Sequence, residues 1–149
     1  MAAYRHPLRI LCVDDNQELV ELVADEKASN GKAARMVGGH TEWAVKFFIP
    51  TDDARLGKGP WKCYIVARVK LKNKTGGVFR YGLYDTNIEN HLAMESAPMS
   101  IAGDEAYHAY GLRFDELKPG MYFWVCPPGG SAVESVCVDR IYLARVKSE

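Results

Sequence analysis

The stretch Trp61-Lys62-Cys63-Tyr64-Ile65-Val66-Ala67-Arg68-Val69-Lys70-Leu71 decides the fold class. Every second residue of this stretch is apolar, whereas Lys62, Arg68 and Lys70 lie between the apolar positions. A period of two is typical of a β-strand with one buried and one exposed face. The stretch therefore predicts a strand that contributes alternate side chains to a core.

Shorter stretches with strand character lie on both sides of this one. We expect further strands over residues 41–49, 78–84, 107–114, 121–126 and 136–146. Clusters of Gly and Pro separate them, and residues 73–77 are expected to form a hairpin turn. Many short strands divided in this way predict an all-β fold, a β-sandwich or jelly roll. Residues 85–105 lack a strand pattern and predict a long ordered loop, a kind of loop that is often functional.

Composition limits the function classes. The 149 residues fit a single domain over 1–149, and 19 Lys plus Arg balance 19 Asp plus Glu. This balance predicts no nucleic-acid partner, and the lack of an apolar run near the ~20 residues of a membrane helix predicts no membrane partner. Residues 1–7 lack the apolar region of a signal peptide, so we expect a cytosolic protein or a piece of a longer secreted one.

The cysteines do not form a zinc motif. Their spacing fits no known zinc pattern, and each lies in an apolar run, where a free thiol behaves as a small hydrophobe: Cys12, Cys63, Cys126 and Cys137. Buried free thiols are the favoured interpretation, and a Cys126–Cys137 bridge across a hairpin is the alternative.

Residues 9–16 resemble the first strand of a two-component receiver domain, with Asp14 and Asp15 as its paired acids. A receiver needs alternating strands and helices after this point. The remaining two thirds of the chain lack that alternation, so we reject the receiver interpretation.

Four stretches carry a different resemblance. Residues 23–33 are similar to a "D-x-x-A-S-x-G-x-A" loop, which residues 40–45 follow. Residues 79–85 are similar to an "F-x-x-G-x-Y-D" strand, and a closing strand pair is resembled by residues 122–125 and 136–141. Together they resemble the galactose-binding-like β-sandwich domains appended to large bacterial glycoside-hydrolase-like proteins.

The resemblance implies a carbohydrate-binding module that binds a polysaccharide or oligosaccharide. It also implies a parent catalytic domain in cis, and a location outside the cell, in the periplasm or on the cell surface as part of a larger protein. A structural or protein-interaction sandwich that packs against its parent enzyme is the alternative, because one fold hosts many functions.

A structural calcium is a further expectation. The 25–31 loop supplies Asp25 and a tight turn, Asp139 lies in an apolar strand, and Asp14 comes from the front of the chain. Calcium prefers such carboxylate and carbonyl oxygens. Alternatively, Asp139 pairs with Arg140 or Arg35, and Asp25 only stabilises its turn.

The predicted sugar site depends on strand phase. Trp43 and Trp61 share the apolar phase and are expected in the core, whereas Tyr122 and Trp124 lie opposite Met121, Phe123 and Val125. The outward phase of other strands holds Tyr64, Arg68, Arg80, Tyr84, Tyr107 and Arg113. Aromatic rings and charged groups on one face suit a sugar, including an acidic one.

We therefore predict a ligand-binding site formed by Arg80, Tyr84, Asp85, Asn87, Tyr107 and Trp124. Two alternatives remain open. Tyr122 and Trp124 form a minor core beneath the 85–105 loop, or Asp85 and Asn87 only form a turn.

Catalysis is not expected. The four histidines are scattered, and the sequence contains no G-x-S-x-G nucleophile motif. Carboxylates are plentiful, but none of them is marked by the sequence as a glycosidase pair.

Overall fold

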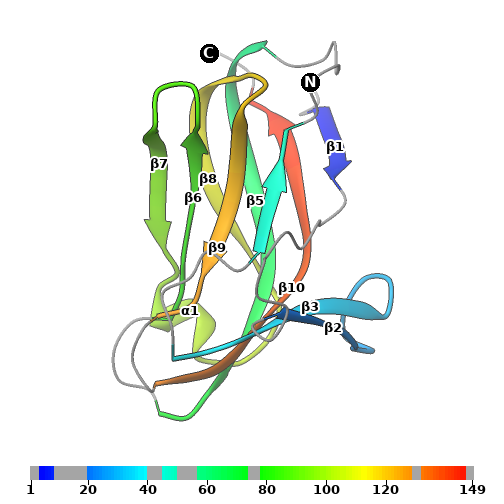
Figure 1. Ribbon diagram of the computed structural model, residues 1–149. Coiled ribbons are helices and arrows are strands. Elements are labelled where there is room, and N and C mark those ends of the chain that lie inside the picture. Colours follow the sequence, from blue (N-terminus) through cyan, green and yellow to red (C-terminus); the bar gives the residue numbers. More distant parts are fainter. Residues whose placement is uncertain are drawn as a thin grey trace.

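The computed structural model describes residues 4–8 (backbone only), 20–39, 45–49, 57–73, 78–128 and 132–146. Asp14, Cys12, Trp43 and the receiver-like stretch 9–16 lie outside the described residues. Figure 1 shows strands in two layers that pack face to face. The two layers are antiparallel sheets, which confirms the predicted β-sandwich and contradicts a receiver fold.

The larger sheet has the order β2-β3-β10-β5-β8 among the described strands, and β1 also pairs with β10. Its strands are β1 (Tyr4–Leu8), β2 (Val20–Ala24), β3 (Lys32–Val37), β5 (Gly57–Leu71), β8 (His108–Leu117) and β10 (Val133–Arg145). The long strand β5 contains the stretch that decided the fold class, and it lies between β10 and β8.

The smaller sheet has the order β4-β9-β6-β7 among the described strands. Its strands are β4 (Val45–Phe48), β6 (Arg80–Asp85), β7 (Asn90–Ser96) and β9 (Met121–Cys126). The short helix α1 (Met99–Ala102) connects β7 to β8 (Figure 1). No helix in the described part of the chain is long and apolar enough to cross a membrane.

The main core fills the space between the two sheets. The alternation predicted for β5 is confirmed, because Trp61, Cys63 and Ile65 are all buried in this core. Phe123 and Val125 of β9 enter it from the opposite sheet. Apolar burial of this kind stabilises a fold by about 25 cal/mol for each Å² removed from water.

Two expectations about the connections are wrong. β5 and β6 lie in different sheets, so these two strands do not form the hairpin expected around residues 73–77, of which 74–77 lie outside the described residues. Residues 85–105 are not a loop, because they contain β7 and α1. β7 has no fully buried residue because it is an edge strand, held by backbone pairing with β6.

The described cysteines are free and buried, namely Cys63, Cys126 and Cys137. The Cys126–Cys137 bridge is therefore absent. Cys126 lies in the smaller sheet and Cys137 in the larger one, so the hairpin that would have joined them does not exist.

Candidate functional site

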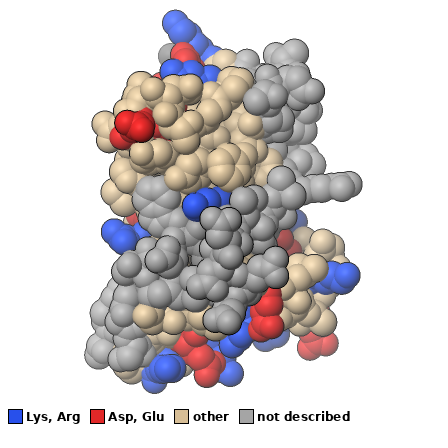
Figure 2. Space-filling model, viewed as in Figure 1, with Lys and Arg blue, Asp and Glu red and all other residues tan. Residues whose placement is uncertain are grey.

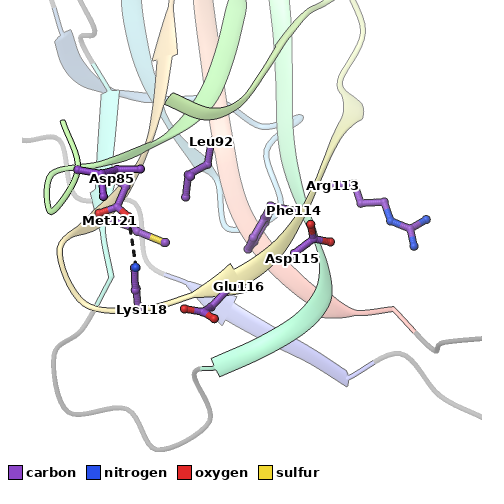
Figure 3. A pocket seen from close by; sticks show the side chains of 9 residues that line it. Asp85, Leu92, Arg113, Phe114, Asp115, Glu116, Lys118 and Met121 are labelled. Atoms are coloured by element: carbon purple, nitrogen blue, oxygen red, sulfur yellow. Dashed lines mark ion pairs between the residues drawn. The ribbon is translucent and has the colours of Figure 1, made fainter. Parts of the chain in front are cut away.

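A cavity of about 560 Å³ opens at one end of the sandwich. Strands β6, β7, β8 and β9 and the turns that join them form its walls (Figure 3). The lining side chains are Asp85, Ile88, Leu92, Arg113, Phe114, Asp115, Glu116, Lys118 and Met121. A concave site of this size falls in the range of small-molecule pockets, ~300–1,000 Å³.

Asp85 lies at the end of β6 and points toward the space between the sheets. Its side chain is only 1% exposed, and its Oδ2 lies 3.6 Å from the ammonium of Lys118. Its Oδ1 accepts hydrogen bonds from the backbone N–H of Asn87 (2.8 Å) and from the Asn87 side-chain amide (2.9 Å). The buried carboxylate is thus both hydrogen-bonded and paired, as burial of a charge requires.

Asn87 fixes the relative position of two turns. Its side-chain amide also donates to the carbonyl of Pro119 at 2.9 Å, and the backbone N–H of Thr86 donates to Gly120. Gly120 has φ +93°, and a Cβ there would lie 2.5 Å from the Asn87 amide nitrogen. Residue 120 must therefore be glycine for the turns to meet, and the joined turns give this cavity a rigid wall.

A β-bulge brings Leu92 to the cavity. Leu83 pairs with Ala93 and Tyr84 pairs with His91, so Leu92 is the extra residue of β7. A bulge redirects a side chain that regular pairing would place elsewhere. Leu92 is 41% exposed and Ile88 is 56% exposed, and they form an apolar rim that remains accessible.

The floor of the cavity is apolar, whereas its edge is charged. Phe114 and Met121 are buried at 6% and 2% exposure. Figure 3 shows Leu92, Phe114 and Met121 around the cavity, and Asp115, Glu116 and Lys118 along its edge. The guanidinium of Arg113 extends away from this group. Apolar side chains can contact the C–H face of a sugar ring, and the charged groups can hydrogen-bond its hydroxyls.

The structure divides the predicted ligand-binding residues among three places. Arg80, Tyr84 and Trp124 lie on the outer face of the smaller sheet, as their phase predicted. Asp85 and Asn87 lie at the end cavity, with Asn87 holding the turn. The third place is on the other sheet and holds Tyr107.

The prediction that Trp124 is accessible to a ligand is wrong, because its side chain is 0% exposed. Its ring covers Gly82, where a Cβ would lie 2.7 Å from the ring. It packs in a minor core with Tyr122 and Cys126, against a half-buried Tyr84. Figure 2 shows mainly uncharged side chains over β6, β7 and β9 on this side of the molecule.

Tyr107 does not join the predicted face, because it lies on the outer face of the larger sheet. Its hydroxyl donates to Asp25 at 2.7 Å. The single face expected from strand phase does not exist, because β5 and β8 belong to one sheet and β6 and β9 to the other.

Asp25 is buried where the 25–31 loop meets the larger sheet. Besides the Tyr107 hydroxyl, it accepts hydrogen bonds from Arg68 Nε (2.9 Å) and the backbone N–H of Lys27 (3.0 Å). Burial raises the pKa of Asp25, but the hydrogen bonds and the charge of Arg68 outweigh it, so the pKa lies below 3.8. Asp25 therefore remains an anion paired with a guanidinium.

The predicted calcium ligands Asp25 and Asp139 both have hydrogen-bond partners within the protein. Asp139 accepts hydrogen bonds from the backbone N–H and the hydroxyl of Ser29, at 3.1 and 3.0 Å. No group of three or more His, Cys, Asp or Glu side chains within the described ranges is arranged to hold a metal ion. Asp14, the third predicted ligand, lies outside those ranges, so the calcium stays a prediction.

Most of the cavity residues were missed by the sequence analysis. Ile88, Leu92 and Lys118 come from turns and an edge strand, where no periodic pattern marks them. Asp85 was found because it comes just past Tyr84, at the end of the F-x-x-G-x-Y-D stretch.

Comparison with solved structures identifies the class of fold. The xylan-binding module CBM15 aligns with a TM-score of 0.55 at 10% identity, over 97% of this chain and 100% of its own. The CBM22-1 xylan-binding domain of Paenibacillus barcinonensis Xyn10C aligns with a TM-score of 0.54 at 8% identity, over 87% of this chain and 82% of its own. Both are carbohydrate-binding modules, and this chain has their β-sandwich fold.

Larger proteins contain the same fold as one part. The arabinose-bound MgGH51 α-L-arabinofuranosidase aligns with a TM-score of 0.55 at 16% identity, over 94% of this chain but only 23% of the enzyme chain. The chain therefore spans about a quarter of that protein. Neither a protein-family model nor a curated protein matches the chain.

Proposed function

We propose that this domain is a non-catalytic carbohydrate-binding module whose end cavity binds a glycan. The observation that carries the proposal is the cavity itself, with an accessible apolar rim of Ile88 and Leu92 beside the charged groups of Glu116 and Lys118. The fold supports the same conclusion, because two proteins that share it over 100% and 82% of their own length are xylan-binding modules.

The role proposed for the cavity is binding and not hydrolysis. Asp85 is held by Asn87 and Lys118, so its carboxylate is occupied by structural contacts. We propose further that the domain works outside the cell, attached to an enzyme that it directs to the glycan. The arabinofuranosidase, in which this fold is one part of a longer chain, supports that arrangement.

Affinity electrophoresis on neutral polysaccharides tests the proposal, with xylan and arabinan first. Leu92→Ala removes exposed apolar surface from the rim and should weaken binding by about tenfold, the effect of losing roughly one good apolar contact. Ile101→Ala is the matched control, because Ile101 is 45% exposed and lies on α1, outside the cavity lining. Equal retardation of both variants would refute the cavity as the site.

A structural role is the second candidate. Ile88, Leu92 and Met94 are large apolar side chains that are 56%, 41% and 47% exposed near the edge strand β7. Exposed apolar side chains that gather along one edge strand and its turn can mark a protein interface. If the domain packs against a parent enzyme, Met94→Asp would release it from that enzyme, whereas glycan retardation would be absent in the wild type.

A further inference from the structure

The outer face of the larger sheet carries a second group of aromatic and charged side chains. Tyr64 of β5 lies directly across from Gly111 of β8 and Tyr142 of β10. One row along, Lys62 lies across from Arg113, and one row in the other direction, Val66 lies across from Arg140. We call Lys62, Tyr64, Arg113, Arg140 and Tyr142 the tyrosine face.

The two tyrosines hold two of these cations in place. Tyr64 and Tyr142 stack with ring centroids 5.0 Å apart and an interplanar angle of 20°. The Lys62 ammonium lies 5.1 Å from the centre of the Tyr64 ring, and the Arg140 guanidinium lies 5.8 Å from that of Tyr142. A cation over a ring is stabilised but keeps its charge and its N–H donors.

The tyrosine face has an excess of positive charge. Lys62 and Arg113 are directly opposite across two strands, and like charges in this position repel each other. Strand β5 contains no acidic residue from Gly57 to Leu71. Within the described part of the chain, no carboxylate forms an ion pair with Lys62, Arg113 or Arg140.

Two acids lie near these cations, Asp139 on β10 and Asp115 on β8, and neither forms an ion pair with them within the described part of the chain. Asp139, next to Arg140, already accepts two hydrogen bonds from Ser29. Farther along the same outer face, Arg68, Lys70 and Arg35 each have a carboxylate partner, namely Asp25, Glu134 and Glu21. An anionic group bound at Lys62 and Arg113 would relieve the repulsion between them, and a second anionic group farther along the same ligand could reach Arg140.

We propose that the tyrosine face binds an acidic polysaccharide through its carboxylate or sulfate groups. The surface lies along three strands and suits an extended chain, with cations in two rows on either side of the tyrosines. Strand geometry separates these rows by about 13 Å, four residues at ~3.3 Å each. Arginine and lysine N–H donors recognise both kinds of anionic group.

A nucleic acid is a poorer fit to this face. Binding of single strands depends on bases that stack on accessible aromatic rings. Here the rings of Tyr64 and Tyr142 stack on each other and carry Lys62 and Arg140, so the face offers charge and hydrogen bonds instead. The tyrosine face and the end cavity are lined by different side chains apart from Arg113, whose guanidinium points away from the cavity.

The test is affinity electrophoresis in gels that contain polygalacturonate, dextran sulfate or uncharged dextran, with an oligo-dT titration in parallel. The wild type should be retarded by one or both anionic polymers and not by dextran, and added salt should reverse the retardation. The double variant Lys62→Gln/Arg140→Gln should lose affinity by about tenfold or more. Lys72→Gln is the control, because it removes an exposed positive charge beyond the far end of β5.

The polymers distinguish the ligand classes. Retardation by polygalacturonate alone assigns a carboxylate, and retardation by dextran sulfate alone assigns a sulfate. Tighter binding to oligo-dT than to both anionic polymers would overturn the proposal. So would a wild type that none of the polymers retards. The proposal would also fail if the Lys72→Gln variant lost as much affinity as the double variant. Retention on neutral xylan is measured separately, so the absence of glycan binding at the end cavity would not affect the test of the tyrosine face.

Discussion

Replacing Tyr110 with phenylalanine should make the protein more stable, although Tyr110 is a core residue. Tyr110 lies on β8, is 3% exposed and packs edge-on against Phe79 at 4.9 Å. Its hydroxyl is buried, and the described part of the chain gives it no hydrogen-bond partner. A buried polar group without a partner costs about 1–3 kcal/mol, so Tyr110→Phe should gain roughly 1–2 kcal/mol after the lost volume is counted.

Tyr81 provides a matched comparison from the opposite sheet. It is 4% exposed, and its hydroxyl donates to the carbonyl of Gly111 at 2.9 Å. Tyr81→Phe removes this hydrogen bond and should cost about 0.5–1.5 kcal/mol. Burial raises the pKa of both tyrosines to about 12, so both hydroxyls are neutral at pH 7 and the comparison is free of charge effects.

Urea denaturation followed by tryptophan fluorescence measures the difference. The denaturant midpoint should rise for Tyr110→Phe and fall for Tyr81→Phe, with the slope m unchanged in both. In thermal unfolding, each kcal/mol corresponds to about 2–4 °C for a domain of this size. If Tyr110→Phe loses as much stability as Tyr81→Phe, the Tyr110 hydroxyl has a partner and the reasoning is wrong.

Three further changes test the minor core, the 25–31 loop and the predicted metal. Gly82→Ala should destabilise the fold by about 2–3 kcal/mol or more in the same denaturation assay, because its Cβ would lie 2.7 Å from the Trp124 ring; a neutral result would mean that the ring does not cover residue 82. Because the pKa of Asp25 is lowered in the folded state, its contribution to the free energy of unfolding is complete above pH ~4 and is lost as pH falls below 3.8. Asp25→Asn should therefore reduce the loss of stability at acid pH, and an unchanged loss would contradict the pairing of Asp25 with Arg68. A calcium bound by Asp139 would make the melting temperature fall in EGTA, and an equal melting temperature with and without the chelator would refute the predicted calcium site.

Strand phase could be predicted from the sequence because it depends only on local alternation. Met121, Phe123 and Val125 belong to the main core, and Tyr122 and Trp124 point to the other side, as predicted. The boundaries of β9 agree with the predicted 121–126. Strand phase is set by the backbone itself, so a correctly located strand without a bulge, such as β9 opposite β6, also has its faces correctly assigned.

Which strands are neighbours could not be predicted, because pairing depends on contacts between distant parts of the chain. β5 and β6 follow each other in sequence but lie in different sheets. The side chains expected on one face, such as Arg68 and Tyr84, are therefore on opposite sides of the molecule. This single error separated the predicted sugar site into parts, and it also concealed the tyrosine face, whose members come from β5, β8 and β10.

Whether an outward-facing ring is covered is a separate question from phase, and for Trp124 the sequence contained a usable signal. Gly82 interrupts β6 between Tyr81 and Leu83, and glycine inside a strand often marks a close approach by another group. Gly82 pairs directly with Trp124, and directly opposed residues of antiparallel strands point to the same side. A bare backbone beside a large indole lets the ring lie down on the sheet, where it loses contact with water. An outward-facing tryptophan opposite a strand glycine should therefore be predicted to pack against the sheet. Ligand contacts should instead be sought at aromatic rings whose cross-strand neighbours have side chains that keep the ring from lying flat on the sheet.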